Sequence, residues 1–342
     1  MEWVQYRIQR INLLSEGCMN RIFLFDNLKF ILIYFVVLGH FMQTHMEISI
    51  YKSLWIFIYA FHMPAFFMIA GYFHKNEDVS NKVMKFFMYG IIIKIILSLT
   101  KFVLMNKISF TLFSEKDLPW FMYVMGFHVL LMYLFRSFDK KIILLFSVVL
   151  SMFIGFDKNI GDFLCLSRTI IFFPFYVMGS MISREFLERL NFYKLRSICF
   201  LAFWLVICIV FSKETGFLGG FFTGRNPFPV KIYPYGPLIR LLTFFISTLL
   251  CFSLLSLISK KRIYYISDLG SKTIQVYLWH RVFLYIFTSL HIDDIVLLNY
   301  FGLIAWGILA LLITLITSMS IFKYPFTIIS SQSNVLRGKD YD

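Results

Sequence analysis

The chain has 342 residues, of which 59% are hydrophobic, 20% are aromatic and only 15% are charged. So large an apolar share excludes an ordinary soluble globular protein and indicates a polytopic membrane protein, with the lipid bilayer as its first partner. The formal net charge of +14 could suggest a nucleic-acid partner. In a membrane protein, however, Lys and Arg gather in the cytoplasmic loops, so no nucleic acid is expected.

Runs of about 20 apolar residues predict an all-α fold of about ten transmembrane helices. With the N-terminus inside, the inner connections and tails hold 20 Lys and Arg, and the outer loops hold 8. This bias predicts that both termini are cytoplasmic. We expect one membrane domain over 1–342, with a tail at 1–22, a ten-helix bundle at 23–322 and a tail at 323–342. The predicted spans are 23–43, 54–73, 84–105, 118–135, 142–156, 168–183, 197–212, 236–258, 272–290 and 296–322.

The first span, DNLKFILIYFVVLGHFMQ (26–43), carries Asp26, Lys29 and His40. Eleven helical residues separate Lys29 from His40, which puts both on one face roughly 16 Å apart, and Asp26 is close enough to pair with Lys29. Ionisable groups inside a span usually face a bundle interior or a water-filled cavity. A packing ion pair and a hydrogen-bonded core histidine are the alternative.

The second span contains FHMPAFFMIAGYF (61–73), which places His62 at a depth close to that of His40. Pro64 frees a backbone carbonyl and bends the helix, either as a packing kink or to open a cavity. At the start of the fourth predicted span, in LPWFMYV (118–124), Trp120 is either an aromatic-belt anchor or a platform for a sugar ring.

Two basic residues stand further along the chain. Arg240, near the start of the eighth span, either snorkels to the surface or faces a cavity. In DLGSKTIQVYLWHR (268–281), His280 and Arg281 fall near mid-span, where a charge usually faces a cavity. Just before Arg240, between the seventh and eighth predicted spans, the loop 213–235 is rich in Gly, Pro and aromatic residues, which suits an ordered outer cap or a re-entrant segment.

Three histidines at comparable depth, His40, His62 and His280, predict acid–base chemistry, because imidazole is a good general base near neutral pH. No HExxH or Cys–His spacing supports a metal site. The five cysteines are scattered and read as free thiols. The chain also lacks the GxSxG, Walker A and GxGxxG motifs of hydrolases, ATPases and Rossmann enzymes.

At these residues the chain resembles the membrane-bound O-acyltransferases of acyltransferase family 3, and within it the fucose 4-O-acetylase-like group. The resemblance implies a ten-helix enzyme that takes acetyl from cytoplasmic acetyl-CoA and passes it to a glycan or lipid-linked sugar. The matching pieces are DNLKFILIYFVVLGH (26–40), FHMPAFFMIAGYF (61–73), LPWFMYV (118–124), FFPFYVMGSMI (172–182) and LGSKTIQVYLWH (269–280).

The family's first-span motif, a basic residue eleven positions before an essential histidine, resembles Lys29 and His40. A family basic pair in the next loop resembles Lys82 and Lys85. Lysine stands at these positions where arginine is common, which loses the bidentate fork. With Lys75 and Lys29, this pair would form a basic mouth for the CoA phosphates. Ordinary positive-inside charge explains the loop lysines equally well.

We therefore expect a multi-pass O-acetyltransferase of a bacterial cytoplasmic membrane, with acetyl-CoA as donor and no metal. His40 would be the general base, assisted by Asp26, Lys29 and His62. Trp120, Arg240, His280 and Arg281 would hold the acceptor, a hydroxyl of a surface or lipid-linked polysaccharide sugar. The alternatives are a transporter or flippase for a lipid-linked or polymeric glycan, and a glycan polymerase or ligase.

Overall fold

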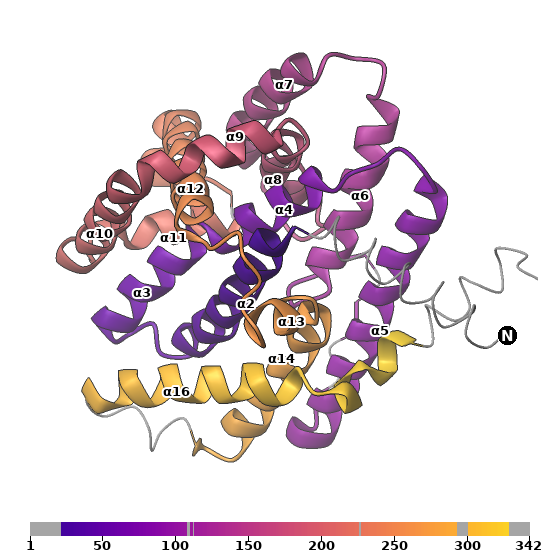
Figure 1. Cartoon of the computed structure of the whole chain (residues 1–342). Coiled ribbons are helices and arrows are strands. Elements are labelled where there is room, and N and C mark those ends of the chain that lie inside the picture. The colour runs from indigo at the N-terminus through magenta and orange to yellow at the C-terminus, as the bar shows by residue number, and fades with distance from the viewer. Residues whose placement is uncertain (1–21, 108–109, 112, 226, 293–299, 328–342) are drawn as a thin grey trace, which may run out of the picture.

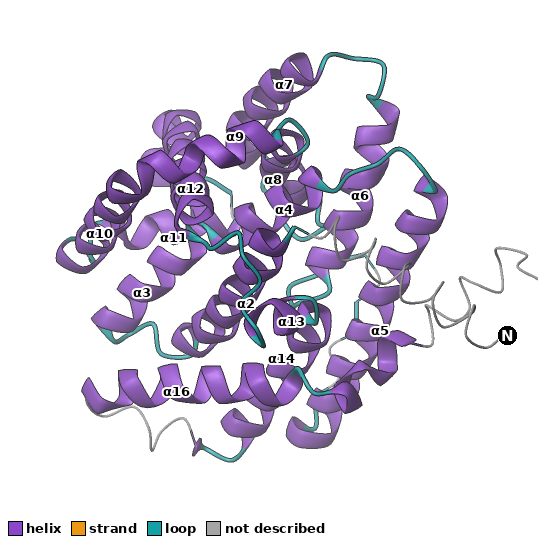
Figure 2. Ribbon diagram, in the orientation of Figure 1, coloured by secondary structure: helices purple, strands orange, loops and turns teal. Residues whose placement is uncertain are grey.

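A computed structural model describes residues 22–107, 110–111, 113–225, 227–292 and 300–327. Within these ranges the chain is built from helices, and the one pairing of extended backbone is an isolated antiparallel bridge between Ser114 and Phe163 (Figure 2). The prediction of an all-α fold is confirmed for this part of the chain. The predicted tails fall almost entirely on 1–21 and 328–342, outside the described residues.

Every predicted apolar run overlaps an α-helix in its described part, and the run 54–73 overlaps two. The α-helices are α2 Phe23–Gln43, α3 Ser49–Tyr59, α4 His62–Tyr72, α5 Val79–Met105, α6 Trp120–Leu134, α7 Lys140–Phe153, α8 Leu166–Gly179, α9 Arg184–Arg189, α10 Lys194–Val210, α11 Leu218–Thr223, α12 Gly236–Leu257, α13 Ile266–Gly270, α14 Thr273–Ser289 and α16 Tyr300–Thr317. The short 3₁₀ turns are η1 Ile154–Phe156, η2 Leu190–Tyr193, η3 Thr215–Phe217, η4 Val230–Tyr235 and η5 Ser320–Lys323.

Five segments among the described residues are long and apolar enough to cross a membrane, and a sixth is added if the bent pair after residue 300 is one span. The helices α6 and α8 are apolar but shorter. These helices support a membrane protein. The full number of about ten spans, with both termini cytoplasmic, stays a prediction.

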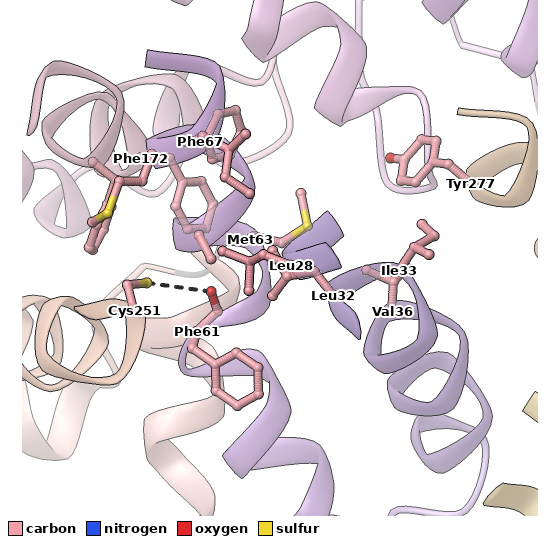
Figure 3. Packing of buried hydrophobic residues seen from close by; sticks show 14 of the residues in the cluster. Leu28, Leu32, Ile33, Val36, Phe61, Met63, Phe67, Phe172, Cys251 and Tyr277 are labelled. Carbon is pink, nitrogen blue, oxygen red and sulfur yellow. Dashed lines mark hydrogen bonds between the residues drawn. The ribbon is translucent and has the colours of Figure 1, made fainter. Parts of the chain in front are cut away.

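The second predicted span is broken between α3 and α4, at Ala60 and Phe61. Pro64 has no N–H to donate to the carbonyl four residues earlier, so the helix cannot run through this point unchanged. At this break the carbonyl oxygen of Ile58 accepts the Phe61 N–H at 3.2 Å and lies 2.8 Å from Nδ1 of His62. Nearby, the thiol of Cys251 in α12 reaches the Phe61 carbonyl at 3.7 Å (Figure 3). The helix is therefore interrupted at this point, and the carbonyl of Ile58 holds the His62 ring in place.

Helix α2 lies at the centre of the molecule, with α16 along one side and α5 and α6 on another (Figure 1). Its first turn is tied to the segment before α14. The amide nitrogen of Asn27 donates to the carbonyls of Ser259 (2.8 Å) and Lys261 (3.0 Å), and Ser267 donates to its oxygen at 2.6 Å. Gly270 packs so closely that an added Cβ would lie 1.8 Å from the Asp26 carbonyl oxygen. These contacts set the position of α14 against α2.

Helices α4 and α8 cross at two glycines. A Cβ on Gly71 would lie 1.9 Å from the backbone oxygen of Tyr176, and a Cβ on Gly179 would lie 2.0 Å from that of Met68. Only glycine permits this approach, because any Cβ would overlap backbone. The crossing brings the chain segments that carry His62 and Arg168 into one bundle.

Candidate active site

Two cavities follow one stripe of α2. The residues Lys29, Ile33, Val36 and His40 are spaced by four, three and four positions, so they share a helix face. Lys29, Ile33 and Val36 line a cavity of about 370 Å³, called here the Lys29 cavity. Val36 and His40 line a second cavity of about 230 Å³, the His40 cavity. Lys29 and His40 of the predicted stripe therefore line two neighbouring cavities that meet at Val36, whereas Asp26 lies outside both linings.

The two cavities share a wall of three side chains, Val36, Met63 and Tyr277. These come from α2, α4 and α14, and Figure 3 shows them from close by. The hydroxyl of Tyr277 donates to the backbone oxygen of Leu118, so the ring is held in place. The Lys29 cavity is otherwise mostly apolar, whereas the His40 cavity carries polar and charged groups.

His40 is half-buried and borders the His40 cavity. Its Nδ1 lies 3.3 Å from Oε1 of Gln43 and 3.4 Å from the hydroxyl of Tyr59. On another side its ring stacks on His280, with centroids 5.3 Å apart. Hydrogen bonds at one ring nitrogen orient an imidazole and leave the other nitrogen for chemistry.

His62 also lines the His40 cavity, 2% exposed, with its ring 4.6 Å from that of Tyr59. Because the Ile58 carbonyl can only accept a hydrogen bond, Nδ1 of His62 carries the proton and Nε2 of the neutral ring has a free lone pair. Tyr59 therefore stands between His40 and His62, a link that the sequence did not indicate.

His280 is fully buried and lies outside the lining of the His40 cavity. Its Nδ1 donates to the Val276 carbonyl at 2.8 Å, as is typical of a histidine fixed in its own helix. The structure thus places it behind His40, where it supports that ring. The His280 side chain does not line the His40 cavity, so it does not directly contact the space in which we expected it to bind the acceptor.

Arg281 borders the His40 cavity and is anchored by a buried network. Its Nε lies 3.1 Å from Oδ1 of Asp117, whose Oδ2 is 2.8 Å from Nζ of Lys101 and accepts a hydrogen bond from Tyr285. Burial would raise the pKa of Asp117, but the charges of Arg281 and Lys101 outweigh it and hold this pKa well below its ordinary value. Asp117 is therefore a carboxylate that fixes the guanidinium.

Trp120 begins α6 and lines the His40 cavity. The guanidinium of Arg168 in α8 lies 4.6 Å from its ring centroid, and Phe172, one turn further on, stacks at 5.7 Å. Arg168 is 4% exposed and also donates to the Glu115 carbonyl at 3.2 Å. Arg168 was not predicted, although a basic residue in an apolar run is the same signal that pointed to Arg281.

The predicted basic mouth is only partly assembled. Lys29 pairs with Asp26 at 2.8 Å and lines the Lys29 cavity. Lys75, Lys82 and Lys85 lie outside that lining: Nζ of Lys82 donates to the Lys75 carbonyl at 3.0 Å, and Lys85 sits over the Tyr89 ring at 5.6 Å.

Arg240 is 3% exposed and lies outside both cavity linings. It donates to the carbonyl of Phe221 in α11, and its guanidinium packs on the rings of Phe221 and Phe228 at 4.9 and 5.8 Å. A cation at the end of a helix stabilises its free carbonyls. Arg240 therefore supports α11, whose Phe222 and Thr223 form part of the His40 cavity wall.

Among the described residues, no group of three or more His, Cys, Asp or Glu side chains could hold a metal ion. The four described cysteines, Cys165, Cys199, Cys208 and Cys251, are free; the fifth, Cys18, lies outside the described residues. The described side chains that line the His40 cavity include imidazole, guanidinium and phenol groups.

A comparison with protein families matches residues 23–323 to the family described as the acyltransferase domain, acyltransferase family 3. The chain belongs to this family. The matched range contains α2 through α16 and both cavities. Searches of curated proteins and of solved structures each found no match. Apolar helices and family together identify a membrane acyltransferase, and the fucose 4-O-acetylase-like group remains a prediction.

Proposed function

We propose that this acyltransferase moves an acetyl group from cytoplasmic acetyl-CoA to a hydroxyl of a cell-surface or lipid-linked polysaccharide sugar. The enzyme would be a multi-pass protein of a bacterial cytoplasmic membrane. One observation carries the proposal: Lys29 and His40 stand on one face of α2 in two cavities that meet at Val36, Met63 and Tyr277. A donor and an acceptor can therefore approach one wall from opposite sides.

The Lys29 cavity suits the donor. Its apolar lining matches the uncharged arm that carries the thioester, and Lys29 offers a positive charge for a phosphate. The nearby Lys75, Lys82 and Lys85 would add long-range attraction for the CoA phosphates. The thioester would then reach the shared wall beside His40.

The His40 cavity suits the acceptor. A sugar ring would pack on Trp120 with its hydroxyl toward the free ring nitrogen of His40. His40 removes the hydroxyl proton as the oxygen attacks the thioester carbonyl, and the charge that develops on the carbonyl oxygen is stabilised by Arg281. When the carbon–sulfur bond breaks, the CoA sulfur takes the proton from His40 and leaves as the thiol. His62 would hold the acceptor through its free Nε2.

The transporter alternative uses the same stripe as a permeation path and needs no acyl donor. The family match is to acyltransferases and does not favour this alternative. The same match does not favour a polymerase or ligase.

The test uses the purified full chain in nanodiscs with acetyl-CoA labelled in the acetyl group. We would measure acetyl-CoA binding, CoA thiol release and transfer of label to free and lipid-linked sugars, for wild type, His40→Ala and a control, His45→Ala. His45 pairs with Glu47 at 3.3 Å and lines neither cavity. We expect loss of release and transfer only in His40→Ala.

Two outcomes would count against the proposal. If none of the three proteins binds acetyl-CoA, the chain is not a CoA-dependent acetyltransferase. If folded His40→Ala transfers acetyl as fast as wild type, His40 is not the general base.

A further inference from the structure

The His40 cavity has an excess of positive charge. Four cationic side chains line it, Lys116, Arg168, Arg225 and Arg281, against one anionic side chain, Asp117. A neutral sugar needs hydroxyl and amide partners and an aromatic surface; it does not need four cations.

The carboxylates near the cavity do not balance these cations. Asp162 is shared by Arg225, at 2.6 Å from its Nε, and by Arg168, at 3.9 Å. Asp117 is likewise shared by Arg281 at 3.1 Å and Lys101 at 2.8 Å. Each of these carboxylates therefore faces two cations.

The charged groups next to the cavity do not cancel its excess of positive charge. Glu115 is matched one to one by Lys94 at 3.0 Å. Lys116 has no ion pair with another described residue. Counting these partners together with the lining groups gives six cations and three carboxylates within the described residues.

Burial makes this excess significant. Arg168 is 4% exposed, and an uncompensated charge at such a position is costly unless an anion completes the pairing. Guanidinium groups bind carboxylate and phosphate oxygens through paired hydrogen bonds that are stronger than those between neutral groups.

The positions of Arg168 and Arg225 relative to Trp120 indicate where a negatively charged group of a bound sugar would lie. Arg168 lies over Trp120 at 4.6 Å, and Arg225 shares its carboxylate partner. A sugar ring on Trp120 would therefore present a charged substituent to these two arginines while a hydroxyl points toward His40.

We propose that the acceptor of this enzyme is an anionic sugar, bearing a phosphate or a carboxylate group that binds between Arg168, Arg225 and Lys116. This inference rests on the proposed function, in which the donor occupies the Lys29 cavity and leaves the His40 cavity to the acceptor.

The experiment measures binding and transfer separately. Purified protein in nanodiscs is titrated with N-acetylglucosamine, with its 1-phosphate and with glucuronic acid, followed by calorimetry at low and high salt. Acetyl transfer from labelled acetyl-CoA to the same three sugars is then measured. The variants are Arg225→Gln at a partly exposed position, Lys116→Gln at an exposed one, the buried Arg168→Gln, and Arg196→Gln as an exposed arginine control outside the cavity.

We expect an anionic sugar to bind about tenfold or more tightly than the neutral one, the effect of a charge-assisted hydrogen bond, and to weaken with salt. Arg225→Gln and Lys116→Gln should reduce that preference severalfold, whereas Arg196→Gln and His40→Ala should keep it. The phosphate and carboxylate arms show which anion is preferred. Arg168→Gln is interpreted only if its unfolding matches wild type.

Equal binding of neutral and anionic sugars would overturn the proposal. It would also fail if Arg225→Gln and Lys116→Gln weaken acetyl-CoA binding and leave sugar binding unchanged, because the cations would then hold CoA phosphates. Selective anionic-sugar binding without acetyl transfer would support the cavity assignment and refute the proposed function instead.

Discussion

The glycine crossing between α4 and α8 allows a sharp test of packing. We expect Gly71→Ala to destabilise the protein, because the new Cβ would lie 1.9 Å from the Tyr176 backbone oxygen. An ordinary contact needs about 3.4 Å, so the two helices must separate by roughly 1.5 Å. Overpacking of this kind costs about 1–3 kcal/mol of unfolding free energy, and backbone can yield less readily than a side chain.

Gly307→Ala is the matched control. Gly307 lies within α16, and its nearest neighbour to an added Cβ is the Tyr34 hydroxyl at 3.6 Å, an ordinary contact. Alanine in a helix interior is favoured over glycine by about 0.5–1 kcal/mol. The same substitution should therefore leave stability unchanged or raise it at Gly307 while lowering it at Gly71.

The assay is unfolding of purified protein in detergent, followed by tryptophan fluorescence. The double variant Gly71→Ala/Gly179→Ala should cost less than the sum of the single changes, since the first substitution already separates the helices. If Gly71→Ala is as stable as Gly307→Ala, the close crossing of α4 and α8 is wrong.

Three further predictions concern the site. Arg281→Gln should lower the transfer rate about 100-fold or more while acetyl-CoA binding changes little, measured by CoA release and equilibrium binding; unchanged turnover would exclude oxyanion stabilisation by Arg281. Val36→Trp should keep acetyl-CoA binding but block transfer by filling the shared wall, whereas Val36→Ala should transfer; normal rates in Val36→Trp would refute the route. The depressed pKa of Asp117 contributes stability that is fully present above the ordinary aspartate pKa of about 3.9 and is lost progressively as the pH falls from there toward the lower pKa of the folded state, so Asp117→Asn should show a shallower acid loss of unfolding temperature than wild type. If the unfolding temperatures of wild type and Asp117→Asn fall in parallel with pH, Asp117 makes no such contribution.

Local helix geometry made part of the site predictable. The spacing of Lys29 and His40 fixes their common face in any regular helix, and the structure places both in cavity linings. Pro64 likewise predicts a disturbed helix, because its missing N–H acts within its own turn.

The depth of a residue along its helix does not predict which way its side chain points within the bundle. The sequence gives His280 and His40 similar depths, but packing puts His280 behind His40 and leaves only His40 half-exposed. The Arg240 side chain likewise points to α11, where it donates to a backbone carbonyl and packs on two aromatic rings.

Contacts between segments far apart in the chain could not be predicted from the sequence either. Arg168 begins the predicted run 168–183, and a charge at the edge of a span is ordinary in sequence terms. Its position over Trp120 depends on how α6 packs against α8. The partner of Arg281, Asp117, is 164 residues away, and no periodicity links the two.

The wall formed by Val36, Met63 and Tyr277 would insulate the two cavities from each other electrically. If water enters the two cavities from opposite faces of a membrane, most of the transmembrane voltage falls across these three uncharged side chains. Carrying one elementary charge through that field involves about 2.3 kcal/mol per 100 mV. An acetyl group is neutral, so the proposed transfer moves it past the wall with no electrical work, while the CoA phosphates and an anionic acceptor stay on their own sides. The reaction should then run at the same rate whether or not the membrane is energised.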